Sequence, residues 1–387
     1  MPNLIVNMRR ELLTHIDQSE HAGLLLDKGF SVWAENAVKK NEIVEIKQHN
    51  NATHDLHIDA SNIVFSPLYE KAYQNWKQYH IENSDNSCVW FGALVNRLFL
   101  GMGESSPLEA GITLHHTYGV PIIPGSAVKG VLSHFANEIG LSDEIKTVLF
   151  GREDNAISKQ DRGEAGCIIF NDAWWIPKGK SLVPEMITVH AQQYYKDKGR
   201  DAPHPDFESP NPNPQIAIQG GFLFSVEGDK KWVKYVIKFL AKAMQCKGLG
   251  AKKASGYGYF THDRRANDAF ADEIESIKNE QDKIIQQATL EKKISDMSAM
   301  AGDFFKQVNN NNWETDKNAF WTPKSEGVEF WVDKLEENND DELRQQIEVL
   351  MEIHFNGVLK EPDKAKGKKF VYKDRVRAIA KRLIALR

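Results

Sequence analysis

The chain is poor in cysteine, and this absence already narrows the kind of protein it can be. Only three cysteines, Cys88, Cys167 and Cys246, occur in its 387 residues. They lie far apart and form no CxxC pair, so the sequence indicates neither a structural zinc site nor a disulfide framework. This usage fits a reducing compartment, and we expect a cytoplasmic protein.

Long apolar runs and an excess of positive charge are also missing. No run of about 18 apolar residues occurs, and the first residues, MPNLIVNMRRELLTH, lack the apolar core of a signal peptide. The formal net charge is −5, with 49 Lys and Arg against 54 Asp and Glu. We therefore expect no membrane span and no free-standing DNA-coating protein, and any nucleic-acid site must be a local patch.

The length of the chain and the changes in composition and hydrophobic pattern along it predict three regions. A chain of 387 residues exceeds a typical single domain. Residues 1–86 favour helices and loops, and the stretch from 36 to 59 is polar and expected to be loop-rich. Residues 87–262 alternate strand and helix patterns, and residues 263–387 predict a helical extension with a basic tail.

The middle region predicts an α+β fold. Its candidate elements occur in the order β, α, β, β, α, β, which is typical of the ferredoxin-like arrangement that the RNA-recognition-motif fold also uses. The helix in the first half is expected to have Ser126 or Gly125 as its N-cap, and the second strand is expected to end at Asn171-Asp172. The predicted elements are a strand at 88–100, a helix from 125 to 139, strands at 166–170 and 215–226, a helix at 230–246 and a strand at 256–260.

The segment QCKGLGAKKASGYGYF, residues 245–260, carries the most informative chemical pattern. Its glycines allow a positive φ or the close approach of another chain, and exposed backbone N–H groups beside lysines form a cradle for phosphate. The GxxxxGK[ST] spacing is absent, so this is not a Walker A loop. An ordinary loop without a ligand fits the composition equally well. The candidate phosphate ligands are Gly248, Gly250, Lys252, Lys253 and Gly256.

Three segments in a fixed order resemble the RAMP superfamily, the RNA-binding proteins of CRISPR systems. The glycine-rich loop after the last helix resembles the signature loop of that family. Residues 119–130, GVPIIPGSAVKG, resemble its helix start, and residues 166–173, GCIIFNDA, resemble the strand that follows an LFG such as residues 149–151. The chain is thereby identified as a member of the superfamily.

Three further segments are similar to the sixth subunit of the type III-B Cmr effector complex. They are HAGLLLDK at 21–28, VHAQQYY at 189–195 and SPNPNPQIAI at 209–218. Val189 stands where those relatives often have proline, and Gln215-Ile216 stands where Phe-Leu is usual. The resemblance covers roughly residues 20–30 and 88–262, and it does not explain the extension from 263 onward.

The resemblance implies a non-catalytic backbone subunit that grips guide RNA near its 3′ end, meets target RNA and stacks on other Cmr or RAMP subunits. It implies no cofactor and no metal. The loop at 190–214 is expected to form a thumb, in which aromatic side chains either stack on bases or pack on the domain itself. A helix start with a nearby lysine suits a phosphate. Beyond the glycine-rich loop, the implied RNA contacts are Arg97 in the first strand, Ser126, Lys129, His190, Tyr194 and Tyr195.

Two other classes of function stay open. An endoribonuclease that processes or cleaves RNA would need a general base, which His115-His116 offers, or an acid such as Glu104. The run from His54 to Asp59 lies in what the sequence predicts to be a polar loop, and it lacks the spacing of a metal motif. A protein–protein scaffold without RNA contact is the second alternative, and the acidic net charge and the helical extension permit it.

The tail from Lys360 forms a separate hypothesis. It holds eleven Lys or Arg against three acidic residues. These cations either touch RNA or an acidic neighbour, or they lie on the solvated face of a docked helix. The cations that recur along the predicted helix are Arg375, Arg377, Lys381 and Arg382.

Overall fold

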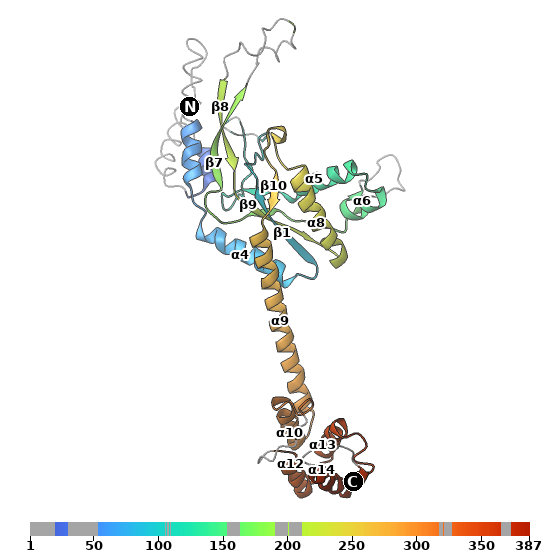
Figure 1. Ribbon diagram of the computed structural model, residues 1–387. Coiled ribbons are helices and arrows are strands. Elements are labelled where there is room, and N and C mark those ends of the chain that lie inside the picture. The colour runs from blue at the N-terminus through green and yellow to red at the C-terminus, as the bar shows by residue number, and fades with distance from the viewer. Residues whose placement is uncertain are drawn as a thin grey trace. The chain divides into compact units, whose positions relative to one another are not determined.

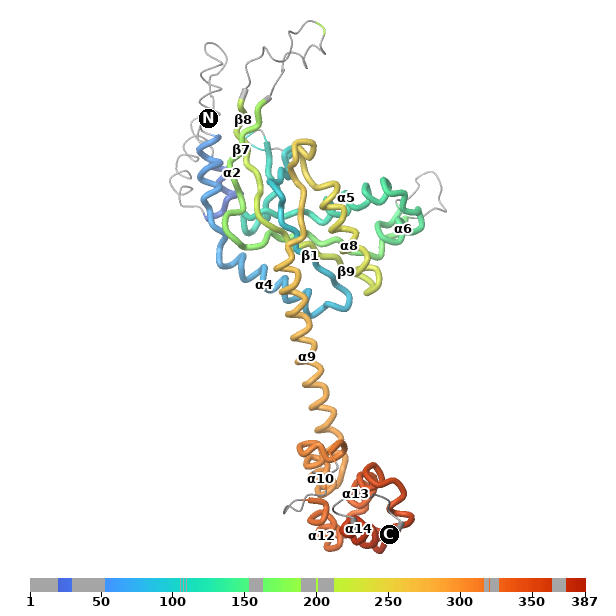
Figure 2. The backbone as a smooth tube through the Cα atoms, in the orientation of Figure 1, coloured from blue at the N-terminus to red at the C-terminus, as the bar shows by residue number. Residues whose placement is uncertain are grey.

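The computed structural model divides the chain into two compact units, residues 1–275 and 276–387. Figures 1 and 2 show the elements of both. No helix in the described part of the chain is both long and apolar enough to cross a membrane. The residues described are 20–29, 53–104, 106, 108, 110–152, 163–189, 200, 211–316, 320, 327–364 and 373–387.

An antiparallel sheet forms the centre of the first unit. Its strands follow the order β10-β1-β9-β6-β2, and β5 also pairs with β9. The long central pair joins β1 to β9 from Ser87↔Glu227 to Ala93↔Gly221. The strands are β1 (Ser87–Leu94), β2 (Ile122–Ile123), β5 (Ile169–Phe170), β6 (Ala173–Trp175), β9 (Gly221–Glu227) and β10 (Phe260–His262).

Helices cover the sheet. Helix α5 (Gly125–Glu138) packs on α8 (Lys230–Cys246), with the rings of Phe135 and Phe239 stacked at 5.1 Å. Successive residues of a strand face opposite sides of a sheet, and β1 shows this alternation. Trp90 lies beside α8, whereas the ring of Phe91 contacts that of Phe270 in α9 (Arg264–Ser295) at 5.4 Å. The expected mixed class of helices and antiparallel sheet is confirmed.

Helix α8 shows why its segment forms a helix at the predicted residues. The Asp229 carboxylate accepts the N–H of Lys231 and so caps the first turn. Val233, Val236 and Leu240 recur at helical spacing and are buried. The helix therefore attaches one apolar face to the sheet and leaves the opposite face to solvent.

Several strand predictions need correction. The first strand ends at Leu94 and not at 100, and the last covers Phe260–His262 instead of 256–260. Residues 166–170 do not form one buried strand, because β5 covers only Ile169–Phe170 and Ile169 is exposed; Asn171-Asp172 then leads directly into β6. Residues 215–226 form two strands that belong to different sheets. Gly220 separates them with a φ of +103°, and a Cβ there would lie 2.7 Å from Nε1 of Trp175, so the sharp turn needs glycine.

A long hairpin of β7 (Leu182–Val189) and β8 (Asn211–Ile218) forms a separate two-stranded sheet. Its register pairs Leu182 with Ile218 and Val189 with Asn211. Beyond its foot, Ile218 exchanges both backbone hydrogen bonds with Leu98, at 2.9 Å each. The predicted thumb at 190–214 lies between and partly within these two strands, and most of it lies outside the described residues.

The N-terminal part differs from the sequence expectation. Residues 53–62 are helical, so the run from His54 to Asp59 lies on a helix and not in the expected polar loop. The side chain of His21 caps the start of helix α2 (Ala22–Lys28), and the side chain of Ser66 caps the start of α4 (Pro67–Glu82). The hydroxyl of Tyr69 in α4 donates to the carbonyl of Trp175 at 2.5 Å, which attaches α4 to β6. Smaller elements are α6 (Asp143–Phe150), β3 (Gly151–Arg152) and β4 (Glu164–Ala165).

The second unit has a hydrophobic core of its own. Phe304, Trp331, Leu343, Met351 and Leu383 are all buried in one cluster. Such a core is what an independently folding domain needs. The helices that build it are α10 (Ala299–Asn310), α12 (Val328–Asn338), α13 (Asp341–His354) and α14 (Lys373–Ala385).

Candidate nucleic-acid interface

The glycine-rich loop adopts a backbone conformation that only glycine tolerates at several positions. Gly248, Gly250, Gly256 and Gly258 have φ values of +63°, +86°, +87° and +77°. A Cβ on Gly258 would penetrate the carbonyl oxygen of Leu249, and one on Gly250 would penetrate that of Phe99. The glycines thus permit both the left-handed turns and the close approach of neighbouring backbone.

Backbone hydrogen bonds fix both sides of this loop. The N–H of Leu249 donates to the carbonyl of Gly258 at 2.8 Å, and Ala251 donates to Phe99 at 2.8 Å. Gly258 donates to the carbonyl of Arg97 at 2.7 Å. The loop is therefore closed at its foot and held against the segment after β1, so that only its tip projects.

The tip, residues 252–256, is exposed and carries two lysines. Lys252 has a φ of +58°, a left-handed conformation that is uncommon outside glycine, and Lys253 opens the 3₁₀ turn Lys253–Ser255. Neither ammonium has a carboxylate within ion-pair distance among the described residues. The predicted cradle thus has its two cations at the point of the loop that faces solvent.

Arg97 lies beside this loop but beyond the end of β1, so the expectation that it belongs to the first strand is wrong. Its guanidinium pairs with the carboxylate of Glu185 in β7. The Tyr257 hydroxyl also bonds to Glu185, and its pKa is raised by burial first and by that carboxylate second. Arg97 and Glu185 thus tie the foot of the hairpin to the loop, a link between residues 88 positions apart that no local pattern reveals.

The start of α5 has a different cap from the one expected. Neither Ser126 nor Gly125 is the N-cap, because helix α5 begins after Pro124, whose fixed φ suits that position. The carboxylate of Asp172 accepts the N–H of Gly125 at 2.7 Å, so a protein anion already sits at this helix start. Ser126 and Lys129 are exposed on the first turn. This hydrogen bond connects the first turn of α5 to Asp172, which lies between β5 and β6 and not in the glycine-rich loop.

His190, Tyr194 and Tyr195 lie outside the described residues. Their contact with RNA stays a prediction that rests on the sequence resemblance. The same holds for the choice between base stacking and packing on the domain.

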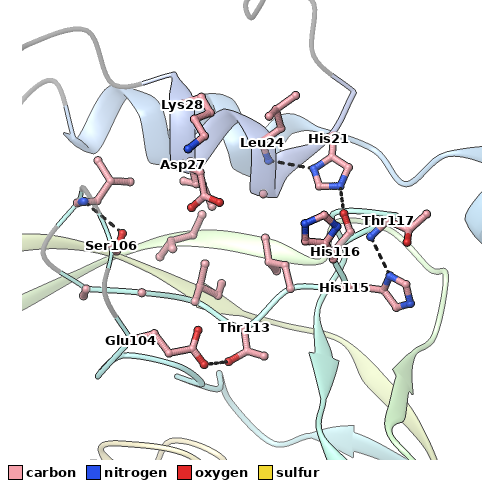
Figure 3. Close-up of a pocket in the computed structure, with 18 residues that line it drawn as sticks. His21, Leu24, Asp27, Lys28, Glu104, Ser106, Thr113, His115, His116 and Thr117 are labelled. Carbon is pink, nitrogen blue, oxygen red and sulfur yellow. Dashed lines mark hydrogen bonds between the residues drawn. The ribbon is translucent and has the colours of Figure 1, made fainter.

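A cavity of about 700 Å³ lies between α2 and residues 104–117, and Figure 3 shows its lining. Two of its histidines, His21 and His115, hold backbone groups. The Nδ1 of His21 accepts the N–H of Leu24 at 2.9 Å, which leaves Nε2 to donate to the carbonyl of His116 at 3.0 Å. The Nδ1 of His115 accepts the N–H of Thr117 at 3.2 Å, and burial lowers the pKa of this imidazole. Glu104 accepts the hydroxyl of Thr113 at 3.1 Å.

The other histidine cluster shows no metal-binding arrangement. His57 is buried on the 53–62 helix, and burial lowers its pKa to about 4. Among the residues that the structure describes, no group of three or more His, Cys, Asp or Glu is placed to hold a metal ion.

The four cations that recur along the helix of the basic tail have acidic partners within their own unit. Arg375 pairs with Glu329 at 2.9 Å, and Lys381 pairs with Asp363 at 2.9 Å. Arg382 pairs with both Asp333 and Glu336, at 2.5 and 2.7 Å. These ion pairs favour the docked-helix interpretation of the tail over an RNA contact.

Comparison with known proteins shows which protein superfamily the central part of the chain matches. Residues 93–261 match the family model of the RAMP superfamily, and they run from the end of β1 through α5 and the glycine-rich loop to β10. This matching region contains all three sequence segments, and the match confirms their resemblance to the RAMP superfamily.

The particular relatives are Cmr proteins. The chain is 26% identical over 256 residues to the CRISPR system Cmr subunit Cmr6 of Pyrococcus furiosus, covering 49% of this chain and 74% of that protein. Among solved structures, it is similar to a chain of the type III-B Cmr-beta bound to cognate target RNA (17% identity, TM-score 0.47, 68% of this chain and 98% of that chain). It is also similar to Cmr6 from Pyrococcus furiosus (20% identity, TM-score 0.28, 46% and 97%).

Proposed function

We propose that this chain is a non-catalytic, guide-RNA-binding backbone subunit of a type III-B CRISPR effector complex, near the 3′ end of the guide. In that role it contributes to target-RNA binding and antiviral defence, with other Cmr or RAMP subunits as neighbours. The observation that carries the proposal is the closed glycine-rich loop with Lys252 and Lys253 at its exposed tip, inside the region that matches the RAMP model.

The chemistry of the loop suits a nucleic-acid backbone. Two lysine ammonium groups attract the phosphates, and the backbone N–H groups of residues 252–254 have no acceptor among the described residues. Contacts of this kind fix the position of a strand and carry no base code. A subunit that must hold any guide needs this property, because the guide sequence varies and the protein does not.

We further assign the sheet to the ferredoxin-like arrangement. In this assignment β1, β9 and β10 are the first, third and fourth strands, β5 and β6 together replace the second, and α5 and α8 are the two helices. The order β10-β1-β9-β6 then has the first and third strands at its centre. The β7–β8 hairpin is an insertion between the second and third strands, where the thumb of the proposal lies.

The remaining predicted contacts have different roles in this proposal. Ser126, Lys129, His190, Tyr194 and Tyr195 stay as RNA contacts. Arg97 changes role, because its charge is already paired with Glu185 and it serves to hold the loop and the hairpin together.

The test is the salt dependence of RNA binding by the full chain and its double variant Lys252→Ala/Lys253→Ala. Each phosphate contact on a single strand contributes about 0.7 to the slope of log affinity against log salt, so the slope should fall by about 1.4. Between 50 and 200 mM salt, a slope of that size corresponds to roughly a sevenfold change in affinity. Fluorescence anisotropy with a labelled guide-length RNA measures both quantities.

The matched control is Lys292→Ala/Lys293→Ala, an adjacent and exposed lysine pair in α9. It should leave the slope unchanged. If the loop variant and the control behave alike, the loop does not bind RNA. If the unaltered protein shows no salt-dependent RNA binding at all, a protein–protein scaffold explains the chain better.

A further inference from the structure

Helix α8 carries an unusual concentration of positive charge. Its sequence, KKWVKYVIKFLAKAMQC, holds five lysines and no acidic residue, although acidic residues outnumber basic ones in the whole chain. Lys230 pairs with Asp85 at 2.7 Å. The other four, Lys231, Lys234, Lys238 and Lys242, are exposed, and in the described part of the chain no carboxylate lies within ion-pair distance of them.

These four lysines share one face of the helix. At about 100° per residue they fall within a stripe of some 80°, opposite the buried residues Val236 and Leu240. From Lys231 to Lys242 the stripe is roughly 16 Å long, since each residue advances the helix by about 1.5 Å. We call these four residues the lysine stripe.

The lysine stripe opposes the stability of its own helix. Lys234, Lys238 and Lys242 follow one another at i, i+4 spacing, where like charges destabilise a helix. Lys231 stands in the first turn, where the helix dipole disfavours a cation. An ordinary solvated helix face mixes both signs of charge, and alternating Glu and Lys would remove this repulsion. A feature that lowers stability without compensation within the fold is expected where it has a function.

A groove of about 420 Å³ runs beside the stripe, between α8 and the β10 edge of the sheet. Lys238, Lys242 and Gln245 line one side, and His262 lies on the other. Nε1 of Trp90 donates to Nδ1 of His262 at 2.9 Å, so the proton of a neutral His262 ring is on Nε2. The groove thus combines an apolar floor, a ring N–H and an amide with two cations.

We propose that the lysine stripe and this groove form a second RNA-binding surface. In it, the ammonium groups of Lys234, Lys238 and Lys242 contact phosphates of one strand, and a base enters the groove next to His262. This surface goes beyond the proposed function, because it uses none of the loop residues and none of the contacts that the resemblance implies.

RNA suits this surface better than an acidic protein does. Lysine is depleted from protein–protein interfaces, which prefer aromatic residues and arginine in an apolar core. Among its lysines, the stripe has one large exposed aromatic side chain, Tyr235. Point charges along a line match a phosphate backbone, and a polar-edged groove of this volume suits one small planar group.

The experiment compares the full chain with Lys234→Gln/Lys238→Gln/Lys242→Gln, using a labelled oligouridine as the probe. Three lost phosphate contacts should lower the salt slope by about 2, which corresponds to roughly a 20-fold change in affinity between 50 and 200 mM salt. The midpoint of thermal unfolding should stay the same or rise, because the substitutions remove like-charge repulsion. The matched control is Lys283→Gln/Lys292→Gln/Lys293→Gln in α9, where three exposed lysines should be neutral for binding.

Two further measurements separate the possible outcomes. His262→Gln should weaken binding of oligouridine but not of an abasic phosphodiester strand, whereas the stripe variant should weaken both. The effects of the stripe and loop variants should add, because they share no partner. An unchanged slope in the stripe variant overturns the proposal even if the loop variant loses affinity. Binding of polyglutamate to the stripe with unchanged RNA affinity would assign the surface to an acidic protein instead.

Discussion

Gly256 and Gly258 offer a matched pair for testing how the RNA-binding loop is built. Both have a positive φ, +87° and +77°, so alanine is conformationally strained at either position. Their surroundings differ. No atom lies within 4 Å of a Cβ built on Gly256, whereas a Cβ on Gly258 would penetrate the carbonyl oxygen of Leu249.

The structure therefore predicts two different losses of unfolding free energy. Gly256→Ala should cost only the left-handed conformation, about 1 kcal/mol. Gly258→Ala has the same cost, and in addition the loop must open around Leu249. That movement breaks the 2.8 Å hydrogen bond from the N–H of Leu249 to the carbonyl of Gly258. A buried hydrogen bond left unmade costs about 1–3 kcal/mol, so the total should reach about 3 kcal/mol.

Urea unfolding of the full chain, followed by far-ultraviolet circular dichroism, measures both values. The transition of the second unit provides an internal reference, because neither glycine belongs to it. RNA affinity should follow the same order, with the larger loss in Gly258→Ala. Equal losses for the two variants would refute the reasoning, since it assigns the difference to the carbonyl of Leu249 alone.

Two more predictions concern groups away from the loop. Burial lowers the pKa of His80 to about 4, so the folded state keeps this imidazole neutral while the unfolded state takes up a proton below about 6.5. The first unit should therefore lose about 3 kcal/mol of stability as pH falls from about 6.5 to 4, and His80→Gln should remove this part of the dependence, measured by urea unfolding at several pH values. Because Arg382 pairs with Asp333 and Glu336, Arg382→Gln should lower the melting temperature of the second unit by a few degrees and leave RNA affinity unchanged. A loss of RNA affinity in a folded Arg382→Gln protein would instead give the tail an RNA contact. Deleting the tail is a poor test, since Val376, Ile379 and Leu383 are part of the core.

The sequence predicts those elements of the fold that depend on neighbouring residues alone, such as helix caps, apolar spacing and glycine turns. Helix α8 occupies the predicted residues because its cap and its apolar spacing agree. The glycines of the loop were recognised because positive φ values need glycine, and the structure has those values. The sequence does not predict the helix at 53–62, because polar residues outnumber the few that form its buried face, Leu56, His57 and Ala60.

Long-range partners account for the remaining errors. The pairing of Arg97 with Glu185 joins the segment after β1 to β7, and the cap of α5 comes from Asp172, 47 residues from Gly125. Neither partner can be read from the residues next to it. Gly220-Gly221 predicts a bulge or bend in the strand at 215–226, but not that its halves pair with different strands, β7 and β1.

The prolines of the β7–β8 hairpin have a consequence for how it meets other molecules. The N–H of Ile218 points away from β7 and donates to Leu98. Every second residue of β8 points its N–H in this outward direction, and Pro212 and Pro214 occupy two of these positions without an N–H to donate. Pro184 occupies the equivalent outward position on β7. Each long edge thus lacks donors that an incoming strand would need. The hairpin can extend far from the domain while resisting strand addition, and with it the edge-to-edge aggregation to which an unprotected ribbon is prone.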